Sequence, residues 1–447
     1  MLDDYFKNVT VIGAAGKMGS GISLLVLQEM IRIELEKKNG VGTGDYRLNL
    51  IDMNEKSLQD LVSYLRSQLV KYAEKEIVSL RKIYKEQKDI VENSEVISDF
   101  VNKALLNIRC DTDLSKAQKS LLVFEAILED FNVKVDLYSK LKKMCSEQTY
   151  FFTNTSSVPI SLIDETAELS GRLIGFHFYN PPAVQKLVEV ICAKNGKKEL
   201  KEMAYDFGKR LKKILVPSND VPGFIGNGHF LRDVLYSINL FDQLRKDFSS
   251  HEAIYIVNRV TQDFMVRPMG IFQLHDYVGV DVCGHILRIM KTYLKDNTFE
   301  SQFINNFLQS KIIGGQYPDG SQKDGILKYE KGKISAIYNL DEKRYFPLTE
   351  GTWKNKCDDY LGKIPDNHFP WKLLSKDANK DEKLQTYFKT LFAGQTPGAL
   401  LAQKYLIKSR DIARALVSQK VAENIEDVNK VLQNGFFHLY GADNQYF

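Results

Sequence analysis

The stretch that decides the fold is Val9-Thr10-Val11-Ile12-Gly13-Ala14-Ala15-Gly16-Lys17-Met18-Gly19, at residues 9–19. A short β-branched run ends in a glycine, and two further glycines lead into a helix-like stretch that reaches about Lys37. Such a strand–turn–helix unit lets backbone N–H groups approach a pyrophosphate, because glycine has no Cβ. We therefore expect a dinucleotide at Gly13, Gly16, Met18 and Gly19. The spacing is one residue longer than the usual G-x-G-x-x-G, so a purely structural turn is the alternative.

An acidic residue at the end of the second strand indicates which dinucleotide is bound. The run RLNLID (47–52) ends in Asp52, whose carboxylate can accept hydrogen bonds from ribose hydroxyls and would repel a 2′-phosphate. NAD is therefore favoured over NADP. The spacing from Gly19 to Asp52 is longer than the spacing from the last glycine to the acidic residue in the common dinucleotide-binding fingerprint. An insertion before the strand, KKNGVGTGDY, accounts for the difference. The alternative is that Asp52 only caps the next helix.

The order of apolar runs predicts the architecture. Strand-like segments at 107–110, 120–127 and 149–154 alternate with helical stretches, which is typical of a parallel, doubly wound sheet. Two further strands, 172–178 and 186–192, are close enough in sequence to pair antiparallel at the sheet edge. From Asp220 onward helices dominate, which predicts a separate all-helical region.

Two polar residues in these last strands suggest a catalytic pair. Glu189 inside LVEV would be costly to bury without a partner, and His177 stands on the preceding strand. If the strands pair across the NPP turn, Glu189 can hold one imidazole nitrogen and increase the basicity of the other. That arrangement suits a general base for alcohol dehydrogenation. A core histidine with a structural partner is the alternative.

Four ordered segments carry a resemblance to a known family. HFYNPPAVQKLVEVI (177–191), Asn154-Thr155-Ser156-Ser157, Asp220-Val221-Pro222-Gly223-Phe224-Ile225-Gly226-Asn227, and Phe124–Glu129 with Lys134 resemble, in order and spacing, motifs of the 3-hydroxyacyl-CoA dehydrogenase family. The resemblance covers about residues 5–310. It implies NAD-dependent oxidation of (S)-3-hydroxyacyl-CoA to 3-oxoacyl-CoA in fatty-acid β-oxidation. Tyr179 stands where phenylalanine is common in the family, which reads as a minor change.

The resemblance also implies roles for individual residues. His177 takes the proton of the 3-hydroxyl, and Glu189 orients His177 and stabilises its cation. Ser156 hydrogen-bonds the substrate oxygen, as Asn227 does from the helical domain. The remaining implied contacts are Asn180 and Lys75 toward the substrate and Asn154, Glu129 and Lys134 toward the cofactor. Each of these roles has a structural alternative. Ser156 and Ser157 could cap a helix, and Asn180 could be a turn residue before Pro181. Asn227 could be a solvated helix residue, and Lys75 a solvated lysine.

We expect four regions in the chain. They are a Rossmann-type NAD-binding domain (1–216), a helical domain like the family's C-terminal one (217–311), a connector with a hairpin and no large core of its own (312–385), and a second, short helical repeat (386–447). A weak repeat, VNRVTQDF (257–264) and VNKVLQNGF (428–436), favours partial duplication of the helical domain. The connector and tail resemble those of longer, fused bacterial relatives.

Composition excludes several other classes. A net charge of +4 on 447 residues is too dilute to indicate nucleic-acid binding. The five cysteines form no C-x-x-C pair, so neither a metal site nor a disulfide framework is expected. The start of the chain lacks a signal peptide, and no apolar stretch is long enough to span a membrane, so a cytoplasmic location is the default.

Partners and competing functions remain open at this stage. We expect an acyl-CoA substrate, and either a homodimer or a monomer in which the tail fills the dimer surface. An enoyl-CoA hydratase could work beside the protein. The alternatives to the dehydrogenase are a scaffold that binds NAD and acyl-CoA with reduced chemistry, and a dehydrogenase of a free 3-hydroxy acid.

Overall fold

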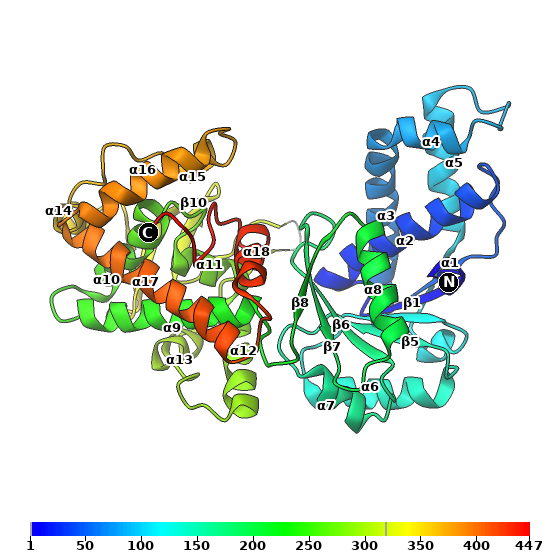
Figure 1. Cartoon of the computed structure of the whole chain (residues 1–447), viewed down its shortest axis with the longest axis horizontal. Helices are drawn as coiled ribbons and strands as arrows, with labels where there is room; N and C mark the ends of the chain where they lie inside the picture. Colours follow the sequence, from blue (N-terminus) through cyan, green and yellow to red (C-terminus); the bar gives the residue numbers. More distant parts are fainter. Residues whose placement is uncertain (1, 318–319) are drawn as a thin grey trace. The chain divides into compact units, whose positions relative to one another are not determined.

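An eight-stranded, mostly parallel sheet is built around the glycine-rich stretch. The computed structural model describes residues 2–317 and 320–447, and it divides into unit 1 (Met1–Asp220) and unit 2 (Val221–Phe447) (Figure 1). The strands of unit 1 follow the order β3-β2-β1-β4-β5-β6-β7-β8 across the sheet. Their bounds are β1 Asn8–Ile12, β2 Arg47–Ile51, β3 Ile108–Asp111, β4 Leu122–Glu125, β5 Tyr150–Thr153, β6 Leu173–Phe178, β7 Leu187–Cys192 and β8 Ile214–Ser218.

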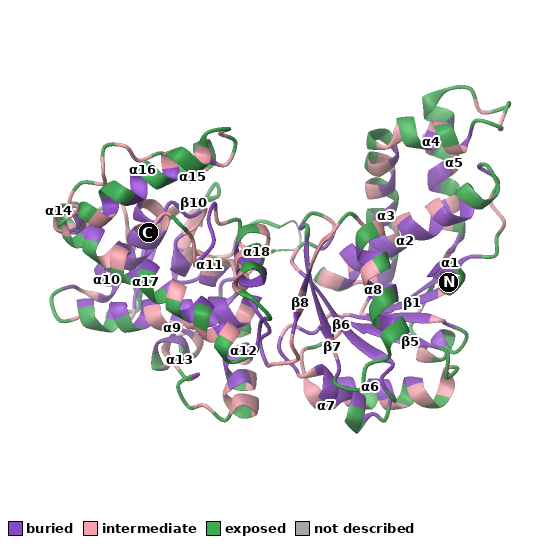
Figure 2. Ribbon diagram, in the orientation of Figure 1, coloured by how far each residue is buried: buried purple, intermediate pink, exposed green. Residues whose placement is uncertain are grey.

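Helices connect the strands and cover both faces of this sheet (Figure 1). Their bounds are α1 Leu2–Tyr5, α2 Lys17–Lys37, α3 Glu55–Lys75, α4 Ile77–Ile83, α5 Asn93–Leu106, the 3₁₀ turn η1 Leu114–Ala117, α6 Phe131–Met144, α7 Ile160–Thr166 and α8 Lys198–Arg210. The central strands are almost wholly buried (Figure 2), as expected of a sheet with helices on both sides. The Rossmann-type sheet predicted from the sequence is confirmed.

Aromatic residues on alternate strand positions form the core of one face. Phe124, Phe152 and Phe176 lie on three neighbouring strands, with ring centroids 5.3, 6.2 and 5.6 Å from that of Phe207 on α8. Because side chains alternate along a strand, His177 must point to the opposite face from Phe176. The aromatic face therefore anchors the strands, and the polar residues of interest share the other face.

The predicted antiparallel pair forms, but it does not lie at the sheet edge. β6 and β7 pair antiparallel with His177 opposite Glu189, and β8 then adds in parallel to β7 and takes the edge. Pro217 lies within β8 and made this strand hard to predict. Proline is tolerated there because one side of an edge strand needs no ladder hydrogen bond. The domain boundary predicted after residue 216 would cut β8, whereas the two units separate after Asp220.

Unit 2 is mainly helical and has one small antiparallel sheet. Its helices are α9 Gly226–Leu244, α10 Ser250–Arg259, the π-helix η2 Val260–Phe264, α11 Ile271–Val278, α12 Val280–Leu294, α13 Gln302–Gln309, α14 Trp353–Leu361, α15 Trp371–Leu374, α16 Lys380–Ala393, α17 Pro397–Ser418 and α18 Ile425–Gly435. The strands β9 Leu327–Glu330, β10 Lys333–Asn339 and β11 Arg344–Pro347 form a three-stranded sheet, one strand more than the predicted hairpin. None of the helices in residues 2–317 and 320–447 is both long and apolar enough to cross a bilayer.

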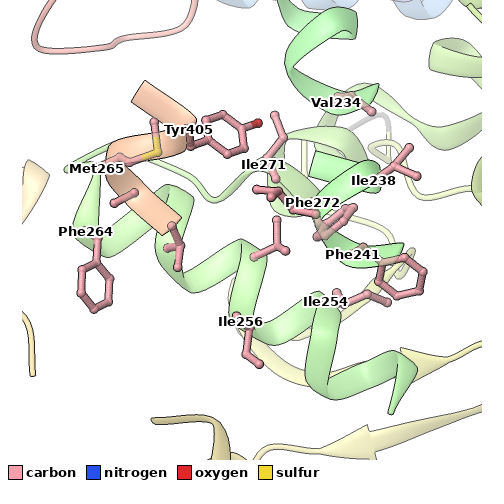
Figure 3. Close-up of a cluster of buried hydrophobic side chains, with 14 of the residues drawn as sticks. Val234, Ile238, Phe241, Ile254, Ile256, Phe264, Met265, Ile271, Phe272 and Tyr405 are labelled. Atoms are coloured by element: carbon pink, nitrogen blue, oxygen red, sulfur yellow. The ribbon is translucent and has the colours of Figure 1, made fainter. Parts of the chain in front are cut away.

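A single hydrophobic cluster joins the parts of unit 2. Figure 3 shows Val234 and Phe241 of α9, Ile254 of α10 and Phe272 of α11 packed with Tyr405 of the tail helix α17. Ile337 of the small sheet and Leu361 of α14 belong to the same cluster. The region predicted as a connector therefore contributes to the core of the helical unit. Duplication of the helical domain stays a prediction.

The side chain of Asp276, on α11, ties the three-stranded sheet to the helices of unit 2. Its Oδ1 accepts a hydrogen bond from the amide of Ile326 (2.7 Å), and its Oδ2 accepts one from the amide of Leu327 (2.8 Å) and one from the Tyr329 hydroxyl (3.1 Å). Asp276 is fully buried on α11. Its neighbour on that helix, His275, is also fully buried, yet neither ring nitrogen has a hydrogen-bond partner in the described chain.

This histidine should make the stability of the protein depend on pH. Burial lowers the pKa of His275 from 6.5 to about 3, so below pH 6.5 the unfolded chain binds a proton that the folded chain does not. The contribution of His275 to the free energy of unfolding should therefore fall as the pH falls through this window, by about 1.4 kcal/mol per pH unit. Replacing His275 with leucine should remove this slope. It should leave stability at pH 7 equal or higher, because two unsatisfied nitrogens disappear.

The measurement is the urea midpoint of wild type and His275→Leu at pH 7 and at pH 5. Other histidines titrate in both proteins, so the difference between the two pH dependences isolates His275. Equal slopes in the two proteins would show that this side chain is hydrated or paired in solution.

Candidate functional site

The glycine loop after β1 forms a cradle that side chains would fill. Gly13 has φ +74°, and a Cβ built on it would lie 2.6 Å from the carbonyl oxygen of Ala126. A Cβ on Gly19 would lie 1.9 Å from the carbonyl oxygen of Gly13. Helix α2 begins directly behind this loop, and its N-cap, Gly16, provides no side-chain cap to the first turn. The loop and the helix start thus have the form that a pyrophosphate requires.

Asp52 lies beside this loop at the end of β2. Its Oδ2 accepts a hydrogen bond from the backbone amide of Ala15 at 3.0 Å. The N-cap of α3 is Asn54, whose side chain accepts from the amide of Ser57 at 3.0 Å, so Asp52 does not cap the helix. Half-buried and next to the cradle, Asp52 can meet the ribose of a dinucleotide. These residues fit an NAD molecule.

A buried group of charges follows β4. The ammonium of Lys134, only 1% exposed, lies 2.7 Å from Oε1 of Glu125 and 3.5 Å from Oε2 of Glu129. The other oxygen of Glu125 accepts hydrogen bonds from the hydroxyls of Thr153 (2.6 Å) and Tyr138 (3.1 Å). Burial alone would lower the pKa of Lys134, but the two carboxylates hold it above its usual value. Lys134 is therefore charged and offsets part of the negative charge of the two carboxylates.

Glu129 in turn fixes the loop that carries the predicted substrate-binding serine. Its Oε1 accepts hydrogen bonds from the amides of Ser156 (2.8 Å) and Ser157 (2.9 Å) and from the hydroxyl of Thr155 (2.7 Å). Burial alone would raise the pKa of Glu129, but Lys134 and these donors hold that pKa below its ordinary range. Glu129 is thus an anionic anchor for the loop at 155–157.

The predicted catalytic pair forms on the same face of the sheet. Nδ1 of His177 lies 3.0 Å from Oε2 of Glu189, and the two residues stand directly opposite each other in the β6–β7 ladder. Glu189 is fully buried and His177 is 8% exposed. Because a carboxylate only accepts hydrogen bonds, Nδ1 carries the proton and donates it, which leaves Nε2 in the basic form.

The turn between these two strands is held by Lys213, immediately before β8. Its ammonium donates hydrogen bonds to the carbonyls of Pro182 and Gln185, both at 2.6 Å. Burial lowers the pKa of Lys213 to about 8. On its other side the turn packs on α2, where a Cβ on Gly21 would lie 2.8 Å from the ring of Pro182. The glycine helix and the His177–Glu189 hairpin are thus packed against each other.

Most of the predicted residues of unit 1 lie together at the carboxyl ends of the parallel strands. Asn154 accepts a hydrogen bond through Oδ1 from the amide of Phe178 (2.9 Å), which ties the end of β5 to the end of β6. Ser156 and Ser157 do not cap α7, because the amides of Ile160 and Ser161 donate to the carboxylate of Asp220 instead (2.7 and 2.6 Å).

Four further predicted residues lie near the ends of helices or in a turn. Met18 is half-buried in the first turn of α2, and Asn180 is half-buried at the start of the turn after β6. Lys75 is exposed in the last turn of α3, as a solvated lysine would be. Asn227, half-buried near the start of α9, belongs to unit 2.

Sequence reasoning missed three residues that organise this site. They are Glu125, Asp220 in its capping role, and Tyr179, whose hydroxyl donates to Oε2 of Glu189 at 3.0 Å. Glu125 could have been found from the sequence, since an acidic residue inside the apolar run LVFEAI needs a partner just as Glu189 does.

Comparison with known proteins identifies relatives of both units. The sequence model of the 3-hydroxyacyl-CoA dehydrogenase NAD-binding domain matches residues 8–221, and that of the C-terminal domain matches residues 244–324. The human mitochondrial hydroxyacyl-coenzyme A dehydrogenase is 34% identical over 282 residues, which cover 63% of this chain and 79% of the relative. A probable 3-hydroxybutyryl-CoA dehydrogenase of Bacillus subtilis is 29% identical over 306 residues, or 66% of this chain and 88% of the relative.

Among solved structures, the fold is similar to that of the 3-hydroxybutyryl-CoA dehydrogenase from Escherichia coli. The two superpose with a TM-score of 0.60 at 19% identity, and the match covers 97% of this chain and 90% of the other. The similarity of fold thus includes the small sheet and the helical tail.

Proposed function

This chain belongs to the 3-hydroxyacyl-CoA dehydrogenase family, and we propose that it oxidises the 3-hydroxyl group of (S)-3-hydroxyacyl-CoA thioesters to the 3-oxo group in fatty-acid β-oxidation. It is an oxidoreductase that acts on a CH–OH group with NAD. The observation that carries the proposed mechanism is the contact of 3.0 Å between Nδ1 of His177 and Oε2 of Glu189.

His177 is the general base of the proposed reaction. With Nδ1–H donated to Glu189, Nε2 takes the proton of the substrate hydroxyl. The buried carboxylate of Glu189 stabilises the imidazolium that results, and it prevents the ring from rotating or changing tautomer. NAD, when bound, supplies the acceptor for the hydride that leaves C3.

The residues that would hold NAD form a continuous group on unit 1. Gly13, Gly16 and Gly19 let backbone amides approach the pyrophosphate, with Met18 beside them in the first turn of α2. Asp52 would accept hydrogen bonds from the adenosine ribose. Asn154, Glu129 and Lys134 act, in this proposal, mainly by fixing the strand ends and the loop at 155–157, since each is engaged with protein groups.

Ser156 is the proposed donor to the substrate oxygen. Its backbone amide donates to Glu129, and its hydroxyl lies 3.3 Å from the same carboxylate. A hydrogen bond of this length is weak, so the hydroxyl can turn to the substrate oxygen with little loss of free energy. The roles of Asn180, Asn227 and Lys75 toward the substrate stay predictions from the family resemblance. So do the oligomeric state, a cytoplasmic location and an enoyl-CoA hydratase partner.

The test is the oxidation of NADH by acetoacetyl-CoA, followed as the loss of absorbance at 340 nm. We expect turnover with NADH and acetoacetyl-CoA, and much weaker turnover with NADPH because Asp52 repels the 2′-phosphate. Free acetoacetate in place of the thioester tests the alternative of a free-acid dehydrogenase.

Each outcome decides between functions. Equal rates with acetoacetate and acetoacetyl-CoA would replace the CoA substrate by the free acid. If NADH binds but no 3-oxoacyl-CoA of any chain length is reduced, the result would favour the scaffold that binds NAD and acyl-CoA. If NADH does not bind at all, the result would contradict the cofactor site.

A further inference from the structure

The carboxylate that orients the catalytic histidine has a second donor on the same oxygen. The hydroxyl of Tyr179 lies 3.0 Å from Oε2 of Glu189, and Nδ1 of His177 lies 3.0 Å from that same atom. The rings of His177 and Tyr179 also lie close together, with centroids 5.0 Å apart and an interplanar angle of 37°. Two donors therefore share one carboxylate oxygen in a buried environment.

The surroundings of Tyr179 favour its neutral, protonated form. Burial and the negative charge of Glu189 raise the pKa of the Tyr179 hydroxyl well above its usual value. The phenol is thus a neutral donor, and it lowers the electron density that Oε2 offers to the imidazole.

Several other charged groups on the neighbouring elements are engaged with partners of their own. They are Glu125 and Glu129 at the end of β4 and in the loop after it (with Lys134 of α6), Asp164 of α7 (with the amides of Gly171 and Leu173), Asp220 after β8 (with the start of α7), Lys213 before β8 (with the turn carbonyls) and Arg210 of α8 (with Asp3, Glu29 and Asp206). Glu189 and Tyr179 both contact His177, Glu189 through a hydrogen bond and Tyr179 through its ring.

We propose that Tyr179 is a positioning residue that sets the basicity of His177 by sharing Oε2 of Glu189. The proposal rests on the proposed function of His177 as the base. A carboxylate with two donors stabilises the imidazolium less than a carboxylate with one, so Tyr179 keeps His177 a weaker base. A weaker base is in its neutral, proton-accepting form over a wider range of pH.

The direction of the expected effect follows from this balance. In Tyr179→Phe, Oε2 of Glu189 is no longer shared with the phenol, and the pKa of His177 should rise. Oxidation needs neutral His177, so the acid limb of kcat/KM for (S)-3-hydroxybutyryl-CoA should move to higher pH by about 0.5 to 1 unit. At a pH below this limb, kcat/KM should fall about threefold to tenfold.

The experiment compares wild type, Tyr179→Phe and the matched control Tyr84→Phe. Tyr84 is a buried phenol that, like Tyr179, donates to a carboxylate, here Asp99 (2.8 Å). Tyr84 directly follows α4 and Asp99 lies on α5, away from the sheet end. The control should lose a similar amount of stability with no shift of the acid limb. A titration of the His177 ring by ¹⁵N NMR in the free enzyme gives the same pKa without any need for turnover.

The outcomes separate this inference from the proposed function. A shift in Tyr179→Phe, absent from Tyr84→Phe, supports the role of Tyr179. Equal His177 pKa values in wild type and Tyr179→Phe overturn it, even where turnover falls. If wild type turned over no 3-hydroxyacyl-CoA, the proposed function would fail, and the NMR titration would still decide whether Tyr179 sets the pKa of His177.

Discussion

Replacing His177 with glutamine should lower kcat about a hundredfold to ten-thousandfold, the range that general-base catalysis contributes, while NADH still binds. Glutamine has a similar length and can still donate an amide N–H to Glu189, so the fully buried carboxylate keeps a partner. It has no basic nitrogen, and the proton of the substrate hydroxyl then has no acceptor at this position. The loss should appear in kcat, because the interaction that is removed exists only in the transition state.

The measurements are kcat with acetoacetyl-CoA and NADH, from absorbance at 340 nm, and the Kd of NADH from its fluorescence. A matched control is His368→Gln, which makes the same change on a half-buried histidine of unit 2. It should retain wild-type turnover. Turnover near wild type in His177→Gln would remove His177 from the mechanism, and loss of NADH binding would show that the variant has lost more than its base.

The sequence predicted the pairing of His177 with Glu189 because each residue is unfavourable if it is buried without a partner. A glutamate within LVEV and a histidine within GFHF each need a partner if buried, and the short NPP turn between the two strands puts them in register. The same reasoning extends to Glu125 in LVFEAI, which is equally buried. Its partner, Lys134, lies on a helix, where strand register gives no information, so this pairing depends on tertiary packing.

The predicted sheet is confirmed except for one strand, β8, where local propensity and tertiary context disagree. β8 contains Pro217, which ordinarily argues against a strand, but an edge position tolerates it. The role of Tyr179 was missed for a different reason. A change from phenylalanine to tyrosine reads as minor in sequence, since a single hydroxyl matters only when it reaches a charged atom. That contact, with Oε2 of Glu189, is fixed by the geometry of the hairpin.

Replacing Gly19 with alanine should weaken NADH binding about tenfold to a hundredfold, since a hydrogen bond from a displaced amide to the charged pyrophosphate contributes about 1.5–3 kcal/mol. A Cβ at this position would lie 1.9 Å from the carbonyl oxygen of Gly13 and 2.8 Å from its carbonyl carbon. Both are backbone atoms of the cradle, so the conflict can be relieved only by moving the loop away from α2. Alanine is otherwise the residue that helices favour most, so a loss here cannot come from helix propensity.

The matched control is Gly16→Ala, in the same loop and with the same change. Gly16 has φ −69°, which any residue adopts, and a Cβ there would approach the carbonyl oxygen of Gly13 only to 3.3 Å. Its effect on the Kd of NADH should be a few-fold. The two variants thus test which glycines the lengthened G-x-x-G-x-x-G loop requires. We expect the loop to require Gly19, where it closely approaches α2. We expect the extra residue of the loop to be accommodated before Gly16. Equal losses in both variants would contradict this reading, because the pyrophosphate would then need an open surface at Gly16 as much as close packing at Gly19.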